Sequence, residues 1–112
     1  MSVRLAYAIH FVADMDRAVA FYRETLGLSL KFTSPDWTEF VTGETTLVLH
    51  TATPQHPAGT FRLGFHVADL QAFYTEMMGK GVTFTMLPTP QFGTTVAQLL
   101  DSEGAECSVG AN

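Results

Sequence analysis

The stretch LAYAIHFVADMDRAVAFYRETLGL, residues 5–28, decides the fold, because much of it returns at residues 61–82 as FRLGFHVADLQAFYTEMMGKGV. Each copy has an apolar-rich run ending in Val-Ala-Asp, followed by the closely matching words AFYRETLG and AFYTEMMG. The aspartates, Asp14 and Asp69, can accept hydrogen bonds from the free N–H groups of a helix's first turn. A chain that uses one strand–helix unit twice is predicted to be two halves of one fold.

Composition indicates a globular chain in a reducing compartment. The 112 residues are 46% hydrophobic, which is enough for a core without disulfides, and the single cysteine, Cys107, cannot form one within the chain. The net charge of −5 argues against nucleic acid and against an anionic membrane surface as partners. There is no signal-peptide pattern, and no apolar run approaches the ~20 residues that span a bilayer. We therefore expect a cytoplasmic protein with neither of these partners.

The hydrophobic periodicity predicts the order βαβββ twice. Expected strands are residues 5–12, 28–33, 37–42 and 45–51 in the first half, and 61–67, 83–87, 94–100 and 106–109 in the second, with a loop at 88–93. In the first helix, the inner stripe is expected to be Ala18, Phe21, Tyr22, Thr25 and Leu26. The linker-like TPQHPAG separates modules 1–52 and 61–112, joined by residues 53–60 within one domain. Three strands after each helix suit a curled mixed sheet of the α+β class.

These motifs resemble the vicinal oxygen chelate superfamily of glyoxalases, bleomycin-resistance proteins and extradiol dioxygenases. The resemblance rests on FVADMDRAVAFYRETLGL, FHVADLQAFYTEMMGKGV and the terminal LLDSEGAECSV, where the family commonly has an Asp-Pro-Asp-Gly turn. It implies two βαβββ modules with a cleft between them, and a homodimer that sometimes exchanges modules between chains. Because this fold hosts many activities, the resemblance is specific for fold and weak for function.

The residues at the family's metal positions do not suit a metal. The resemblance implies four ligands, two from each module, that are usually His, Glu or Gln. Counting from the predicted caps and turns puts Tyr7, Val48, Arg62 and Ser108 there. Valine cannot ligate a metal, and arginine carries only hydrogen-bond donors and a positive charge. We therefore expect no metal site and no cofactor.

Arg62 is the most informative single residue, because a guanidinium on a concave sheet face needs a partner. That partner is predicted to be Glu106 or Tyr7, or the carboxylate, phosphate or enolate of a ligand, which arginine can hold with two parallel hydrogen bonds. Both interpretations hold together if a ligand displaces the internal pair.

The histidines keep two alternatives open. His50 and His66 are expected to face the cleft near its rim, whereas His10 points under the first helix. A displaced metal site made of His50, His66 and Glu106 is one alternative. The other is a metal-free acid–base site with a histidine as base and Arg62 stabilising an oxyanion.

Aromatic residues on the predicted strands and loops favour a flat, partly apolar ligand. The expected cleft-rim residues are Phe11, Phe32, Trp37, Phe40 and Phe92, with Trp37 as the best stacking candidate. Packing of Trp37 against a neighbouring strand or a dimer partner stays open.

The sequence thus predicts a metal-free protein of the glyoxalase/bleomycin-resistance type that binds a small organic molecule, such as a drug or an aromatic metabolite. The predicted ligand-binding residues are Tyr7, Phe11, Trp37, Val48, His50, Arg62, His66, Glu106 and Ser108. The alternatives are a glyoxalase-like lyase, isomerase or dioxygenase, and a binding module with a vestigial cleft. Neither the ligand nor any catalysed reaction follows from the sequence.

Overall fold

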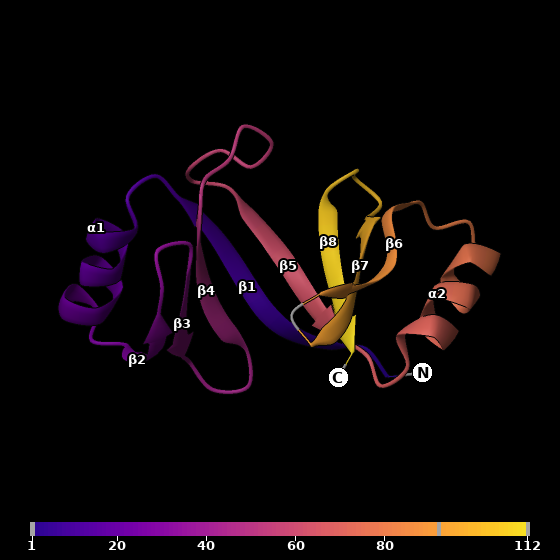
Figure 1. Cartoon of the computed structure of the whole chain (residues 1–112), viewed down its shortest axis with the longest axis horizontal. Helices are drawn as coiled ribbons and strands as arrows, with labels where there is room; N and C mark the ends of the chain where they lie inside the picture. The colour runs from indigo at the N-terminus through magenta and orange to yellow at the C-terminus, as the bar shows by residue number, and fades with distance from the viewer. Residues whose placement is uncertain (1, 92, 112) are drawn as a thin grey trace. The chain divides into compact units, whose positions relative to one another are not determined.

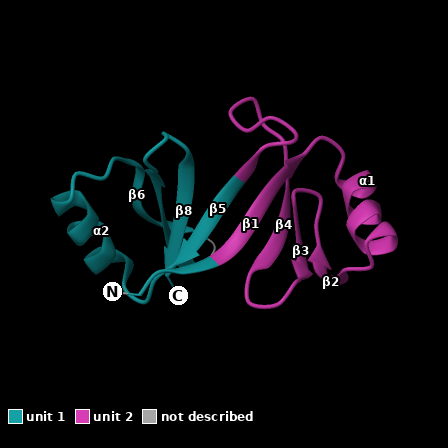
Figure 2. Ribbon diagram, turned by 180° about the vertical axis from the view of Figure 1, so that it is seen from behind, with its two compact units in different colours: residues 1–5, 62–112 teal, residues 6–61 magenta. Residues whose placement is uncertain are grey.

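The computed structural model describes residues 2–91 and 93–111. They form two compact units: residues 6–61, and the described part of residues 1–5 and 62–112 (Figure 2). The division falls next to the predicted end of the linker, although the first residues of the chain group with the second unit. Each unit has one helical segment and a mixed sheet, so the predicted α+β class is confirmed.

The unit of residues 6–61 contains most of the first strand and the first helix (Figure 1). Its elements are β1 (Arg4–Val12), α1 (Met15–Ala20), a π-helical turn η1 (Phe21–Thr25), β2 (Ser29–Thr33), β3 (Trp37–Val41) and β4 (Thr46–Thr51). The strands follow the order β2-β3-β4-β1, with β1 parallel to β4 and the other pairs antiparallel.

The other unit repeats this arrangement. Its elements are β5 (Phe61–His66), α2 (Leu70–Gly79), β6 (Phe84–Gln91), β7 (Thr94–Leu100) and β8 (Glu106–Ala111). The order is β5-β8-β7-β6, with β5 parallel to β8 and the other pairs antiparallel. Both halves therefore have the βαβββ order that the repeat predicts.

Both helices begin where the repeated aspartates predict. The Arg17 backbone N–H donates to Asp14 Oδ1 at 3.1 Å, and the Ala72 backbone N–H donates to Asp69 Oδ1 at 3.0 Å. Each bond satisfies a donor that a helix cannot pair within itself. The chain therefore leaves each first strand and turns into its helix at the same place in the motif.

Each unit has a core between its helical segment and one face of its sheet. The buried residues of the core that includes the start of α1 are Val12, Met15, Phe40 and Leu49. The buried residues of the core that includes α2 are Val67, Leu70, Phe73, Ala97, Val109 and Ala111. Since side chains alternate along a strand, the other face of each sheet is turned away from its helix and presents the candidate site residues.

The predicted inner stripe of the first helix is partly wrong. Ala18 and Tyr22 pack against the core, but Phe21 is 49% exposed, Leu26 is 54% exposed and Thr25 is also exposed. The reason is a change of helix type: the Leu26 N–H donates to the Phe21 carbonyl at 3.0 Å, five residues back. This wider turn rotates the following residues away from the positions that a period of 3.6 assigns to them.

The predicted loop at 88–93 is also wrong in its described part. Strand β6 continues through Pro88 and Pro90 to Gln91, while Phe92 lies outside the described residues. Proline lacks the N–H that a central strand needs, but β6 is the last strand in the sheet order. Irregular pairing with β7 on both sides of Met86 accommodates the prolines further.

Candidate functional site

In the unit of residues 6–61, the strand face turned away from α1 is rich in aromatic side chains. We call it the aromatic face; it consists of Tyr7, Ile9, Phe11, Trp37, Glu39, Val48 and His50. Strand pairing sets Ile9 and Glu39 beside Val48, and Phe11 and Trp37 beside His50. Five of the nine predicted ligand-binding residues thus share one face.

Trp37 contacts two other rings of this face. Its ring meets Tyr7 edge-on at 6.5 Å between centroids and His50 edge-on at 5.7 Å. Tyr7 is 37% exposed, whereas Phe11 and Val48 are fully buried. In this structure Phe11 and Val48 therefore form the buried floor of the face, and Tyr7 lies at its exposed rim.

Glu39 is the residue that sequence reasoning missed. It is only 8% exposed; the Trp37 indole N–H donates to its Oε2 at 2.8 Å, and Lys31 Nζ lies 3.7 Å from its Oε1. A carboxylate in such surroundings is costly to bury unless it is paired in this way. Strand alternation puts Glu39 on the same face as Trp37, but its burial and its contact with Lys31 follow only from the folded sheet.

The same alternation overturns the prediction for Phe40. It is completely buried on the opposite face of β3, where it packs in the core under α1 with its ring 6.0 Å from that of Tyr22. Phe40 therefore belongs to the core and not to a ligand-binding rim. Phe32 on β2 is exposed.

In the other unit, the strand face turned away from α2 is polar. We call it the polar face; it consists of Arg62 and His66 on β5, Thr85 on β6, Gln98 on β7, and Glu106 and Ser108 on β8. Ser108 lies between Gly64 and Gln98 in the strand register. The four remaining predicted ligand-binding residues share this face.

Arg62 forms the ion pair with Glu106 that was one of its two predicted roles. Arg62 Nη1 donates to Glu106 Oε1 at 3.4 Å, and the two side chains are 13% and 26% exposed. The Thr85 hydroxyl donates to the other Glu106 oxygen, Oε2, at 2.8 Å. A guanidinium has five N–H donors in a planar fork, so this long contact uses a small part of its hydrogen-bonding capacity.

The histidines occupy separate environments. His66 Nε2 is buried and has no hydrogen-bond partner among the described residues, which is unusual for a polar atom. His50 Nδ1 lies 2.7 Å from the Thr51 carbonyl oxygen, and His10 lies on the helix side of β1, as predicted. Within residues 2–91 and 93–111, no three side chains of the His, Cys, Asp and Glu types gather closely enough to hold a metal ion.

The residues at the family's four metal positions do not fit a metal either. Val48 is a buried hydrocarbon side chain, and Arg62 is a cation already paired with a carboxylate. Neither can give an electron pair to a divalent ion.

Comparison with known proteins identifies the family of this chain. The family model for the Glyoxalase/Bleomycin resistance protein/Dioxygenase superfamily matches residues 4–108. The chain belongs to this superfamily. A relative in Bacillus subtilis (strain 168), the uncharacterized protein YurT, is 35% identical over 111 residues, covering 84% of this chain and 87% of YurT.

Solved structures of other proteins have a similar fold. The hypothetical protein BH1468 from Bacillus halodurans C-125 has a TM-score of 0.86 and 18% identity, covering all of this chain and 96% of that one. A variant of Streptomyces coelicolor methylmalonyl-CoA epimerase in complex with 2-nitronate-propionyl-CoA has a TM-score of 0.80 and 20% identity, covering 97% and 94%. At these identities the likeness establishes the fold alone. None of the described helices is both long and apolar enough to span a bilayer.

Proposed function

We propose that this superfamily member binds a small organic acid without a resident metal ion, and that Arg62 supplies the positive charge for the ligand's acidic group. The observation that carries the proposal is the Arg62–Glu106 pair on the polar face, 3.4 Å apart and largely shielded from water. Arginine puts a fixed cation at a strand position where the family resemblance implies a metal ligand.

The geometry supports exchange of this internal pair for a ligand. A carboxylate that accepts two parallel N–H bonds from Arg62 would form a stronger contact than the 3.4 Å bond from Nη1 to Glu106. Glu106 would keep the hydroxyl bond from Thr85, so its charge would not be left without a partner. His66 lies on the same strand four residues later, and its buried Nε2 is a further polar group that a ligand or a water molecule would satisfy.

A matched ligand panel tests the charge preference. Each organic acid, for example benzoate, is compared with its uncharged amide by thermal shift and calorimetry. An acid at a hundredfold excess over its Kd should raise the unfolding free energy by about 2.7 kcal/mol, and its amide by much less. Equal binding of acids and amides would contradict the role of Arg62, and no binding across a broad panel would favour a vestigial binding module.

Two variants test whether the acid binds at Arg62. The double variant Arg62→Met/Glu106→Gln removes both charges together, so that no lone charge remains on the polar face. It should bind acids more weakly than the native protein does, while Arg23→Met, which removes an exposed arginine of η1, should bind them as the native protein does. If the double variant binds acids as tightly as the native protein, the acid is held elsewhere.

A second candidate is an isomerase that removes a proton next to a carbonyl group and returns it. Glu39 favours this reading, because it is a buried carboxylate held by Trp37 and Lys31 on the same face as Tyr7. Such a carboxylate can act as a general base, with the proton passing to one of its oxygens and then back to the carbon. The epimerase neighbour makes methylmalonyl-CoA a suitable probe.

Deuterium exchange separates the two candidates. An isomerase incubated with methylmalonyl-CoA in D₂O would introduce deuterium at the carbon between the two carbonyl groups faster than the background reaction, and Glu39→Gln would abolish the excess. A binding protein would show no excess. The acidity of the chain, with only six Lys and Arg residues, is unfavourable for a ligand that carries several phosphate charges.

A further inference from the structure

The structure contains a pocket that the proposed function does not use. It has a volume of about 460 Å³ and lies in the unit of residues 6–61, between the end of β1, the helical segment and the loop around Gly59. Its lining residues His10 and Val12 are on the helix side of β1, the opposite side from the aromatic face. This volume is within the range typical of small-molecule sites.

Small residues create the hollow. Ala13, Ala18, Ala58 and Gly59 line it, and a Cβ atom placed on Gly59 would meet no other atom within 4 Å. The loop is held in place by a pair of backbone bonds, because Gly59 N–H donates to the Phe11 carbonyl at 2.9 Å and Phe11 N–H donates to the Thr60 carbonyl at 2.9 Å. These two bonds fix the side of the pocket formed by the loop around Gly59.

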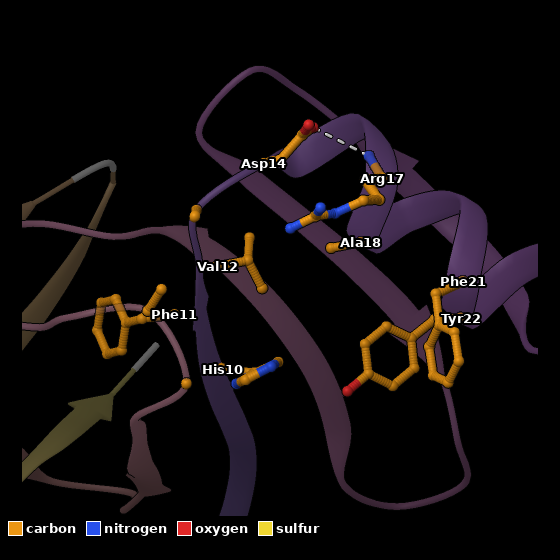
Figure 3. Close-up of a pocket in the computed structure, with 11 residues that line it drawn as sticks. His10, Phe11, Val12, Asp14, Arg17, Ala18, Phe21 and Tyr22 are labelled. Carbon is orange, nitrogen blue, oxygen red and sulfur yellow. Dashed lines mark hydrogen bonds between the residues drawn. The ribbon is translucent and has the colours of Figure 1, made fainter.

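Aromatic rings form the apolar part of the pocket. Tyr22 and the half-exposed Phe21 come from η1, and His10 comes from β1 (Figure 3). The His10 ring is stacked on the exposed ring of Phe61, with 4.2 Å between the ring centroids. The π-helical turn brings two successive aromatic residues to this pocket instead of burying Phe21 in the core. Single π-helical turns of this kind are frequent at functional sites.

Arg17 gives the pocket its charge. Its side chain extends from α1 toward the strand that carries His10 and Val12 (Figure 3). Its guanidinium has no ion-pair partner among the described residues, whereas the Asp14 carboxylate at the pocket edge already caps the helix by accepting the Arg17 backbone N–H. Asp14 keeps its negative charge, but its carboxylate is engaged by the helix cap, so Arg17 is the group in the pocket lining that can pair with an anion.

His10 adds a hydrogen-bond acceptor. Its Nδ1 lies 3.4 Å from the Thr60 carbonyl oxygen, which can only accept, so this contact requires a proton on Nδ1. In the neutral ring, Nε2 then carries the lone pair. A ligand with a hydroxyl group could donate to it.

From these features we propose that this pocket is a second binding site, for a small planar aromatic carboxylate. The carboxylate pairs with Arg17, and the ring packs against Phe21 and Tyr22. The proposal is independent of the acid site at Arg62, since the two arginines belong to different units of the chain.

The probe is 4-hydroxybenzoate, with 4-hydroxybenzamide as its uncharged control, and the readout is backbone NMR shifts together with calorimetry on the whole chain. We expect shifts at Ala13, Ala18 and Gly59, and weaker binding of the amide. Arg17→Met should weaken binding by about tenfold or more, the loss expected for a charged hydrogen bond. Ala58→Trp, which fills the pocket from an exposed loop and keeps the charge, should abolish the shifts at Ala13, Ala18 and Gly59.

The controls separate this site from the one at Arg62. Arg23→Met and the double variant Arg62→Met/Glu106→Gln should leave the shifts at Ala13, Ala18 and Gly59 unchanged. The proposal is overturned if Arg17→Met and Ala58→Trp both bind the acid as the native protein does. It is also overturned if the shifts map only to residues outside this pocket, or if no binding is detected at about 1 mM, where a ligand with a Kd of 1 mM is half bound.

Discussion

The thiol of Cys107 illustrates how burial controls a single residue. Burial raises the pKa of Cys107, and the nearby Asp101 carboxylate raises it further, while the Arg62 charge opposes both. An unfolded thiol ionises near pH 8.5. Above about that pH the unfolded chain loses a proton that the native chain keeps, so the free energy of unfolding should fall as the pH rises.

Urea unfolding at a series of alkaline pH values measures this slope, and Cys107→Ala should remove its share. In the same pH range the native thiol should react slowly with iodoacetamide compared with the thiol in urea, because only the exposed thiolate is a good nucleophile. Native alkylation as fast as that of the unfolded chain would show that Cys107 is accessible and ionised.

Two charged residues on the strand faces show how far the candidate site could be predicted from the sequence. Arg62 was found because it occupies a position counted from the repeated motif, and its pairing with Glu106 was one of two predicted roles. Glu39 was missed because no such count points to it; its significance depends on contacts with Trp37 and Lys31 that only the folded sheet creates. Phe40 was assigned to the wrong face, although strand alternation from Trp37 would have placed it correctly.

At the scale of the element, the helix caps are predicted to stabilise both units. Asp69→Ala removes the acceptor for the Ala72 N–H at the start of α2, and we expect it to lower the free energy of unfolding by about 1 kcal/mol. Asp69→Asn keeps an oxygen at the same place and should lose much less. Chemical denaturation of the three proteins checks the order, and equal losses for Ala and Asn would indicate that charge rather than the hydrogen bond matters.

The positions of strands and helices could be predicted where they depend only on the local sequence. The caps and the alternating strands obey local rules, so their positions could be read from the repeated motif. Strand β6 and the turn η1 could not, because a proline in a strand is tolerated only at a sheet edge, and the edge is decided by the order of all the strands. Likewise, the i to i+5 bond at Phe21 leaves no mark in the hydrophobic period.

For the whole molecule, we predict self-association into a homodimer. Large hydrophobic side chains are exposed on both units, among them Leu26, Phe61, Leu63 and Leu87. A homodimer would cover part of this apolar surface, and exposed apolar side chains that gather in a patch commonly mark an interface. Sedimentation equilibrium should give twice the monomer mass, and single lysine substitutions at Leu26, Leu63 and Leu87 should show which surface is covered. A monomer at all accessible concentrations would contradict the prediction.

At the same scale, we predict that the folded protein holds no resident divalent metal ion. A resident divalent ion binds the folded state and raises its melting temperature, and a chelator removes that gain. Since Val48 and Arg62 supply no electron pair at the family's metal positions, we expect EDTA to leave the melting temperature unchanged. Zn²⁺, Mn²⁺ and Ni²⁺ added after EDTA should likewise give no stoichiometric binding by calorimetry.

Elemental analysis of the purified protein provides the independent measurement. One metal ion per chain, lost with EDTA together with several degrees of melting temperature, would show that other side chains hold it. The comparison of Glu39→Gln with Glu106→Gln would then identify the unit responsible, because these carboxylates belong to different units and each is a strong oxygen ligand. Absence of metal in both measurements, combined with a preference for acids that depends on Arg62, would leave the guanidinium as the group that attracts the ligand.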